Sequence, residues 1–173
     1  MKRVPTISIS FLLLFSVCAG AREFQAQTAP PPAPLKKVSS IQVLMIQSEE
    51  VKLPAEFQIS LYENLIQQLQ KKGGFEHIYR DGDKSATGDV VVLHSTVRGF
   101  KKGSEMARQV TTVAGKTSID VHCQFTDKDG ATVLERDVNG KVRFLGGNLR
   151  ATLDFAKKTA KITQENFAMK SGS

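Results

Sequence analysis

The chain of 173 residues carries 24 Lys and Arg residues against 17 Asp and Glu residues, which gives a net charge of +7. That excess favours association with an anionic partner, such as a phospholipid headgroup or an acidic polysaccharide, without bearing on the fold. No nucleic-acid-binding motif accompanies the charge, so we predict no nucleic-acid partner. Two cysteines are too few for a disulfide-rich scaffold.

The N-terminus has the pattern of an export signal. Two basic residues precede an apolar core, Phe11–Val17, and Ala19-Gly20-Ala21 supplies the small residues that signal peptidase needs at its cleavage site. We therefore predict a signal peptide over residues 1–21, cleaved after Ala21, and an exported location in the periplasm or cell envelope.

Two alternatives concern the same leader. Lipidation at Cys18 would anchor the protein to a membrane, but Val17 rather than a small residue directly precedes this cysteine. A retained membrane-spanning anchor is disfavoured by Pro5 and several hydroxyl residues, because a spanning helix needs about 20 predominantly apolar residues. Cleavage after Ala21 is favoured over both. It leaves Cys123 as the one cysteine of the mature chain, which excludes an intramolecular disulfide.

A Pro-rich segment, residues 22–40, follows the leader. Four prolines lie between Ala29 and Leu35, and the flanking residues are small or polar. Such a composition buries too little apolar surface to fold, so we predict a disordered linker. The folded part is then a single domain over residues 41–169, with a disordered tail at 170–173.

The predicted domain begins with a strand and a helix. The apolar run Ile41–Gln47 indicates a largely buried strand. Leu53-Pro54 then begins a helix, because proline is tolerated in the first turn. Gly73-Gly74 ends this helix, and Phe75–Asp83 follows as a short strand and a turn. The helix has one apolar stripe, formed by Phe57, Leu61, Leu65, Leu69 and Ile66.

Three more strands are predicted. Asp89–Phe100 is apolar on both faces over Val90–Leu93, which indicates a central strand. The segment Lys116–Gly130 begins with strict alternation, in which polar residues separate Ile119, Val121, Cys123 and Phe125. Asp129-Gly130 predicts a tight turn into the hairpin partner, Ala131–Val138.

Gly146-Gly147 separates these strands from a last helix. One face of this helix is apolar, formed by Leu149, Leu153, Ala156, Ala160 and Phe167, and the opposite face carries Lys157, Lys158 and Lys161. The order strand, helix, four strands, helix predicts an α+β fold. We expect a two-layer sandwich with a mixed, mostly antiparallel sheet of about five strands and both helices on one face.

Few residues suggest chemistry. His94 and His122 lie on neighbouring predicted strands and would approach each other if those strands pair in register. No third ligand stands at a recognisable spacing, so we assign no metal site, no catalytic residue and no cofactor. Cys123 is interpreted as a core residue rather than a nucleophile, because it belongs to the apolar row of its strand.

Two segments are candidates for contact with an anion or a partner. Gly146-Gly147-Asn148 precedes a helix and lies near Arg143 and Arg150, and helix N-termini favour negative charge. The loop Arg98–Val110 is basic and punctuated by glycine, with Lys101-Lys102 near its start. An ordinary loop and a solvated hairpin connection are the alternatives for these segments.

The order of several motifs resembles a known family. These are the Leu-Pro before the first helix, the "KKGGF" exit from it, an Asp-led central strand followed by "GSEMAR", the turn "DKDG" and a late Gly-rich link. In this order, over roughly Leu53 to Phe167, they resemble the bacterial envelope proteins grouped as domain of unknown function 4410. The resemblance implies an α+β envelope module, commonly a lipoprotein, and brings no catalytic residues. The weak lipidation pattern at Cys18 departs from it.

We therefore expect a non-catalytic, exported envelope module that binds another envelope protein or assists the assembly of an envelope complex. Weak contact with an anionic ligand or a lipid headgroup is a further expectation, and the oligomeric state is left open. The alternative is a small periplasmic hydrolase, or a ligand or metal carrier, that uses His94 and His122.

Overall fold

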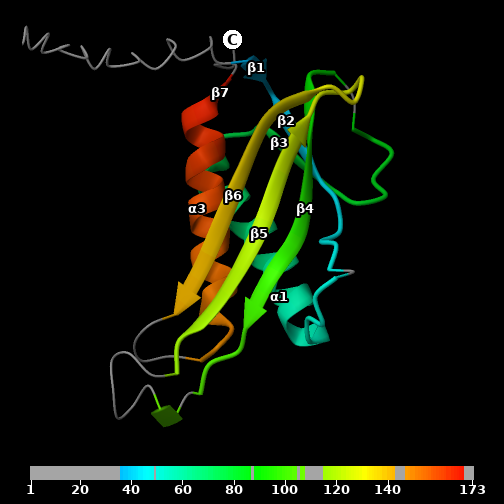
Figure 1. Ribbon diagram of the computed structural model, residues 1–173. Helices are drawn as coiled ribbons and strands as arrows, with labels where there is room; N and C mark the ends of the chain where they lie inside the picture. The colour runs from blue at the N-terminus through cyan, green and yellow to red at the C-terminus, as the bar shows by residue number, and fades with distance from the viewer. Residues whose placement is uncertain are drawn as a thin grey trace, which may run out of the picture. The chain divides into compact units, whose positions relative to one another are not determined.

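A five-stranded mixed sheet, with strand order β3-β2-β4-β5-β6, organises the structure (Figure 1). The strands β3, β2 and β4 run parallel to one another, whereas β4, β5 and β6 are antiparallel neighbours. The predicted mixed sheet is thus confirmed, with β4 at its centre. The five strands are β2 Ser40–Val43, β3 His77–Arg80, β4 Val90–Lys101, β5 Thr117–Thr126 and β6 Thr132–Val142.

This computed structural model describes residues 36–48, 50–86, 88–104, 106–107, 115–142 and 147–169. The predicted signal peptide, residues 22–35 of the predicted linker and the predicted tail lie outside these residues. All the described residues belong to one compact unit, residues 34–173.

Two helices form the second layer of the α+β sandwich. The first, α1 Ala55–Gln68, continues into a π-helical turn, η1 Leu69–Gly73, and the last is α3 Arg150–Asn166. Both lie on the same side of the sheet (Figure 1). Gly74 follows η1 in the left-handed conformation, which glycine adopts at little cost, so the predicted helix end is confirmed.

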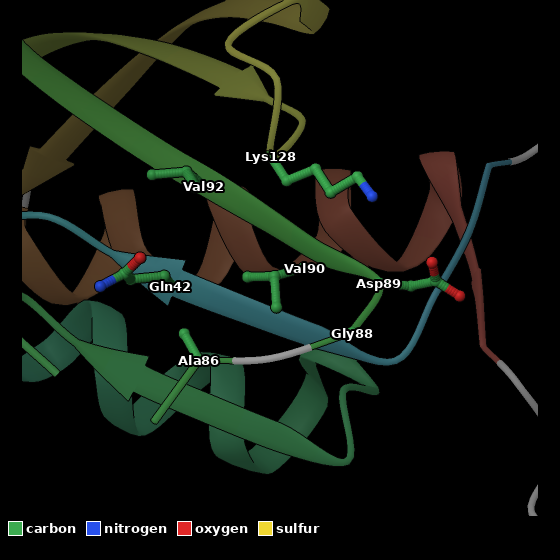
Figure 2. A pocket seen from close by; sticks show the side chains of 7 residues that line it. All are labelled: Gln42, Ala86, Gly88, Asp89, Val90, Val92 and Lys128. Atoms are coloured by element: carbon green, nitrogen blue, oxygen red, sulfur yellow. The ribbon is translucent and has the colours of Figure 1, made fainter. Parts of the chain in front are cut away.

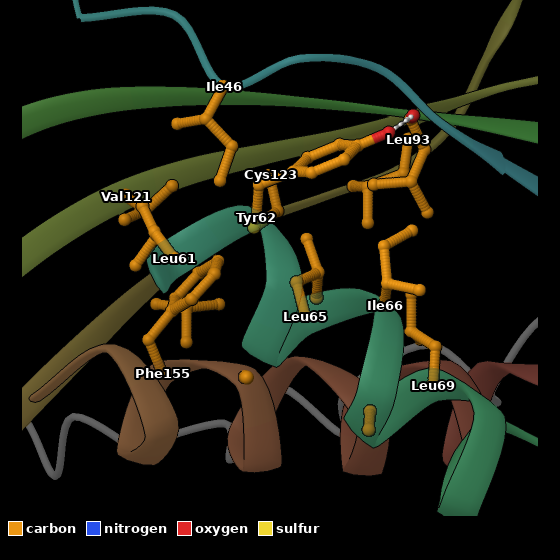
Figure 3. Close-up of a cluster of buried hydrophobic side chains, with 14 of the residues drawn as sticks. Ile46, Leu61, Tyr62, Leu65, Ile66, Leu69, Leu93, Val121, Cys123 and Phe155 are labelled. Carbon is orange, nitrogen blue, oxygen red and sulfur yellow. Dashed lines mark hydrogen bonds between the residues drawn. The ribbon is translucent and has the colours of Figure 1, made fainter. Parts of the chain in front are cut away.

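The predicted stripe of α1 is the centre of the core. Phe57, Leu61, Leu65 and Leu69 are all fully buried, and Figure 3 shows side chains of α1 between α3 and the strands. Tyr62 belongs to the same layer and donates a hydrogen bond from its hydroxyl to the carbonyl of Val43, at 3.2 Å. Burial of this stripe, rather than helix propensity alone, holds α1 in place.

The predicted stripe of α3 is offset from the one observed. Ala156 and Ala160 are buried, but Leu149 is 40% exposed and Leu153 is only half-buried. The buried face instead includes three threonines whose hydroxyls donate to backbone carbonyls of the preceding turn, Thr152 to Leu149, Thr159 to Phe155 and Thr163 to Ala160. Because these hydroxyls form hydrogen bonds within the helix, threonine can be buried at low cost. The hydropathy pattern instead predicted buried leucines.

Glycine allows α3 to lie close to β6. A Cβ atom at Gly140 would lie 2.2 Å from the carbonyl oxygen of Ala151 and 2.8 Å from the Cβ of Phe155. Both distances are too short for non-bonded atoms, so any side chain here would push the helix from the sheet. Gly140 therefore contributes to the fold through close backbone approach.

A second, two-stranded sheet was not predicted. In it β1 Lys36–Val38 runs parallel to β7 Phe167–Met169. Residues 36–40 are therefore strand residues or join two strands, rather than linker as predicted, and Phe167 lies beyond the helix to which it was assigned. The reason is burial: Val38 and Phe167 are both buried, and the ring of Phe167 lies 5.5 Å from that of Phe125.

The strand predicted over Ile41–Gln47 is shorter in the structure. β2 ends at Val43, and the chain leaves the ladder because the backbone N–H of Met45 donates to the carboxylate of Asp81, at 3.0 Å. The chain rejoins the sheet at Gln47, which forms an isolated parallel bridge with Thr96.

Candidate functional surface on the open face of the sheet

The helices cover one face of the sheet, and its opposite face, here called the open face, is the candidate functional surface. Figure 1 shows that face across β4, β5 and β6, with the helices on the far side. The alternation of side chains along each strand identifies the residues of this face. In β5, the buried Ile119, Val121 and Cys123 point toward the helices, and the residues between them point away. The open face is formed by Gln42, Val90, Val92, His94, Thr96, Arg98, Ser118, Asp120, His122, Gln124, Glu135, Asp137, Asn139 and Lys141.

Cross-strand hydrogen bonds hold the polar side chains of this face in place. Asn139 donates its amide to the carboxylate of Asp120, Gln124 donates to Glu135 at 2.9 Å, and Nδ1 of His122 lies 2.8 Å from Oδ1 of Asp137. We call these three pairs between β5 and β6 the polar ladder. These pairs favour particular rotamers, which lowers the side-chain entropy that a partner would have to remove on binding.

The centre of the polar ladder is electrostatically coupled. The hydrogen bond from His122 lowers the pKa of Asp137 below its ordinary value, and the nearby guanidinium of Arg98 acts in the same direction. The Nη1 atom of Arg98 lies 3.6 Å from Oδ1 of Asp137. One carboxylate thus interacts with two possible cations from two neighbouring strands.

The register between β4 and β5 decides the metal hypothesis. His94 lies opposite Gln124 and His122 opposite Thr96, so the two histidines share the open face but are offset by two residues. Each also has its own partner, since Nε2 of His94 lies 3.3 Å from the hydroxyl of Thr126 and His122 contacts Asp137. No three metal-ligating side chains converge anywhere in the part of the chain that the structure describes.

Cys123 lies in the core, as its place in the alternating row predicted. It is fully buried, and burial raises the pKa of its thiol to about 12. The hydroxyls of Ser95 and Thr159 lie beside it and act weakly against that rise. At neutral pH the thiol is protonated and out of reach of solvent, so it lacks the properties of a nucleophile.

The predicted anion site before α3 is only partly described, because Arg143 and Gly146 lie outside the described residues. The first backbone N–H groups of the helix are already occupied: those of Arg150, Ala151 and Thr152 each donate to a carbonyl three residues earlier, at 3.1 Å. An anion would find none of these three donors available.

A hollow of about 490 Å³ at one end of the open face was not predicted. Figure 2 shows Val90 and Val92 of β4 along it, with Gln42 on one side and Lys128 across from them. The side chain of Gln42 is held by the carbonyls of Arg80 and Asp83, at 3.5 and 3.3 Å, which keeps this wall in place. In the sequence, this hollow was indicated only by Val90 and Val92, the two open-face valines that follow Asp89. The lining residues are Gln42, Ala86, Gly88, Asp89, Val90, Val92 and Lys128.

No helix among the described residues combines the length and the apolar character needed to cross a bilayer. The described part of the chain thus presents a polar face with a hollow at one end. Its candidate reactive groups are buried, as Cys123 is, or in contact with neighbours, as His94 and His122 are.

Comparison with known proteins gives a family and a fold. A sequence model of the family described as "Domain of unknown function (DUF4410)" matches residues 24–147. No curated protein matches the chain. Among solved structures it is similar to the PelC dodecamer from Paraburkholderia phytofirmans, with a TM-score of 0.56 and 16% identity over 77% of this chain and 92% of that one. A point variant of the same dodecamer gives a TM-score of 0.57, again with 16% identity, over 75% and 89% of the two chains.

Proposed function

The chain belongs to the domain of unknown function 4410 family, and we propose that it is a non-catalytic module of the bacterial envelope that assembles with further copies of itself through the open face of its sheet. The envelope location rests on the export pattern of residues 1–21 and on the envelope proteins that the chain resembles.

The single observation that carries the proposal is the open face itself. Small-molecule sites are concave and enclose most of their ligand, whereas protein partners bind flat surfaces of about 800 Å² per partner. The face presents side chains from four strands, and the polar ladder orders those of β5 and β6 in advance. An ordered polar face loses less conformational entropy on binding, which suits it to recognition by a protein.

A second copy is the proposed occupant of this face. The PelC chains that share the fold were solved as dodecamers, which makes self-association the first assembly to test for this chain. The hollow beside Val90 and Val92 offers such a partner a recess with both apolar and polar walls, which a single anchoring side chain could fill.

The non-catalytic part of the proposal rests on the candidate reactive groups. Cys123 is buried and protonated, His122 is engaged with Asp137, and His94 lies two residues out of register with His122. A hydrolase or metal carrier built on the two histidines would need both imidazoles at one point. Asp137 contacts His122, but the register places Thr96 opposite His122 and Gln124 opposite His94.

The solution mass of the purified chain tests the assembly, with two matched variants. Thr96→Arg adds a long cation at the middle of the open face, and Gln67→Arg adds the same side chain on the exposed side of α1. We expect the wild type and Gln67→Arg to be oligomeric by light scattering, and Thr96→Arg to have the mass of a monomer. A monomeric wild type, or equal masses for the two variants, would contradict the proposal.

A further inference from the structure

The net charge of the chain is concentrated in two connections. After residue 21 the chain has 22 Lys and Arg residues and 17 Asp and Glu residues. Residues 101–116, from the last residue of β4 to the start of β5, and residues 143–150, from the end of β6 to the first residue of α3, together hold six of these basic residues and one of the acidic ones. The remaining 16 basic and 16 acidic residues cancel. The whole excess of positive charge outside the leader therefore lies in two short segments.

Hydrogen bonds join the described residues of these two connections to one another. The hydroxyl of Thr117 accepts from the backbone N–H of Gly103, at 3.0 Å, and donates to the side chain of Asn148, at 2.5 Å. Gly103 also packs so tightly that a Cβ atom on it would lie 1.9 Å from the carbonyl oxygen of Gly115. Residues on either side of these contacts are thus held near one another.

Basic and exposed apolar residues both occur next to these contacts. We define the basic end by its described residues, Lys101, Lys102, Met106, Lys116, Leu149 and Arg150. Met106 is 77% exposed and Leu149 40% exposed, which makes them two of the four large hydrophobic residues that are exposed in the described part of the chain. The turn that carries Met106 is held to Gly103 through Ser104, whose hydroxyl accepts from the N–H of Ala107 at 3.2 Å.

Two lysines of this end, Lys101 and Lys102, are exposed. Within the described residues, no ion pair joins Lys101, Lys102 or Lys116 to a carboxylate, whereas Lys158 and Lys161 of α3 pair with Asp154 and Glu165. Exposed lysines near exposed apolar side chains are features with which a protein binds the surface of an anionic bilayer. The cations meet the headgroups, and the apolar side chains enter the boundary with the acyl chains.

We propose that the basic end binds the surface of an anionic membrane, with Met106 and Leu149 entering its interfacial layer. The apolar pair favours a bilayer over a soluble polyanion, because a polyanion offers charge but no apolar region in which to bury them. The basic end lies at the far end of β4 from β1 and β7 (Figure 1). The open face extends along the strands between those ends, and Lys101, which pairs with Ser118, lies at its edge, so membrane contact and self-association use adjoining surfaces.

Sedimentation with lipid vesicles tests this proposal on the purified chain. The probes are vesicles of phosphatidylcholine alone and of phosphatidylcholine mixed with phosphatidylglycerol. We expect binding to the mixed vesicles only, weakened by added salt because the charges are screened. The variant Lys101→Gln/Lys102→Gln should lower the partition coefficient on the order of twenty-fold, since each charge near an anionic surface contributes about a five-fold effect.

Matched variants separate the basic end from net charge in general. Lys71→Gln/Lys72→Gln removes two adjacent exposed lysines of η1 and should leave vesicle binding within about two-fold of the wild type. Met106→Gln keeps the charge and should weaken binding through its apolar part alone. Absence of binding to mixed vesicles, equal losses in the two double variants, or full binding by Met106→Gln would each overturn the proposal. The mass measured without vesicles tests the open face independently of this outcome.

Discussion

The two faces of β5 show how one strand serves two purposes. Toward the helices it presents Ile119, Val121, Cys123 and Phe125, all buried, and their partners are the apolar side chains of α1 and α3. Toward the outside it presents Asp120, His122 and Gln124, whose partners are polar side chains of β6. The first face gains free energy from removing apolar surface from water, and the second gains little from its exposed pairs. The helix-facing side of the sheet thus stabilises the fold, and the opposite side is the one proposed for recognition.

The largest loss of stability is expected from a substitution in the helix-facing core. Phe155 is fully buried between α3 and the sheet, so Phe155→Ala should lower the free energy of unfolding by about 3–5 kcal/mol. His122→Ala, on the open face of the same sheet, should lower it by less than about 1 kcal/mol. Chemical denaturation of the two variants measures both changes. Equal losses would show that the open face also carries the fold.

A smaller effect should follow from the buried thiol at alkaline pH. The folded pKa of Cys123 is raised to about 12 by burial, whereas an unfolded cysteine titrates near ~8.5. The folded state therefore favours the protonated thiol. The stability associated with this group is complete below the unfolded pKa and is lost as the pH rises toward the folded one.

Unfolding measured between neutral and strongly alkaline pH tests this. Above about pH 9 the stability of the wild type should fall by up to ~1.4 kcal/mol per pH unit relative to Cys123→Ala. The native thiol should also resist alkylation at neutral pH and react once the protein is unfolded. Parallel pH profiles for the two proteins, or rapid alkylation of the native state, would place the thiol in contact with solvent.

The smallest effect concerns Asp137 on the open face. Its pKa is lowered by the hydrogen bond from His122, so its contribution is present above the ordinary carboxyl pKa and is lost as the pH falls through the lowered value. In an NMR titration, His122→Gln should shift the midpoint of Asp137 upward. Asn166→Gln at the end of α3 changes a distant polar residue and should leave the midpoint unchanged. A midpoint insensitive to His122 would remove the evidence for the coupled centre of the polar ladder.

Local patterns in the sequence predicted most of the fold. The four-residue repeat of Leu61, Leu65 and Leu69 and the alternation of β5 each require only neighbouring positions, and the structure confirms both. The α3 stripe was misplaced because the hydroxyls of Thr152, Thr159 and Thr163 are satisfied inside the helix, which no hydropathy value records. The β1–β7 sheet was missed because its two strands are three residues long and pair across almost the whole domain.

The candidate surfaces depend on contacts between distant residues. The register that pairs His122 with Asp137 and separates it from His94 is set by the packing of whole strands, so it could not be deduced from either strand alone. The basic end likewise arises because Thr117 joins Gly103 to Asn148, 45 positions apart in the sequence. Loop charges that look scattered along the chain become one surface only in three dimensions.

Sedimentation velocity of Thr96→Arg beside Phe155→Ala tests the division between the two faces most directly. If the helix-facing side carries the fold and the open face carries assembly, Thr96→Arg should sediment as a folded monomer with an unchanged circular dichroism spectrum, while folded Phe155→Ala should remain oligomeric but unfold at lower denaturant concentration. An oligomer that persists in Thr96→Arg, or a variant that loses its fold together with its assembly, would contradict this account.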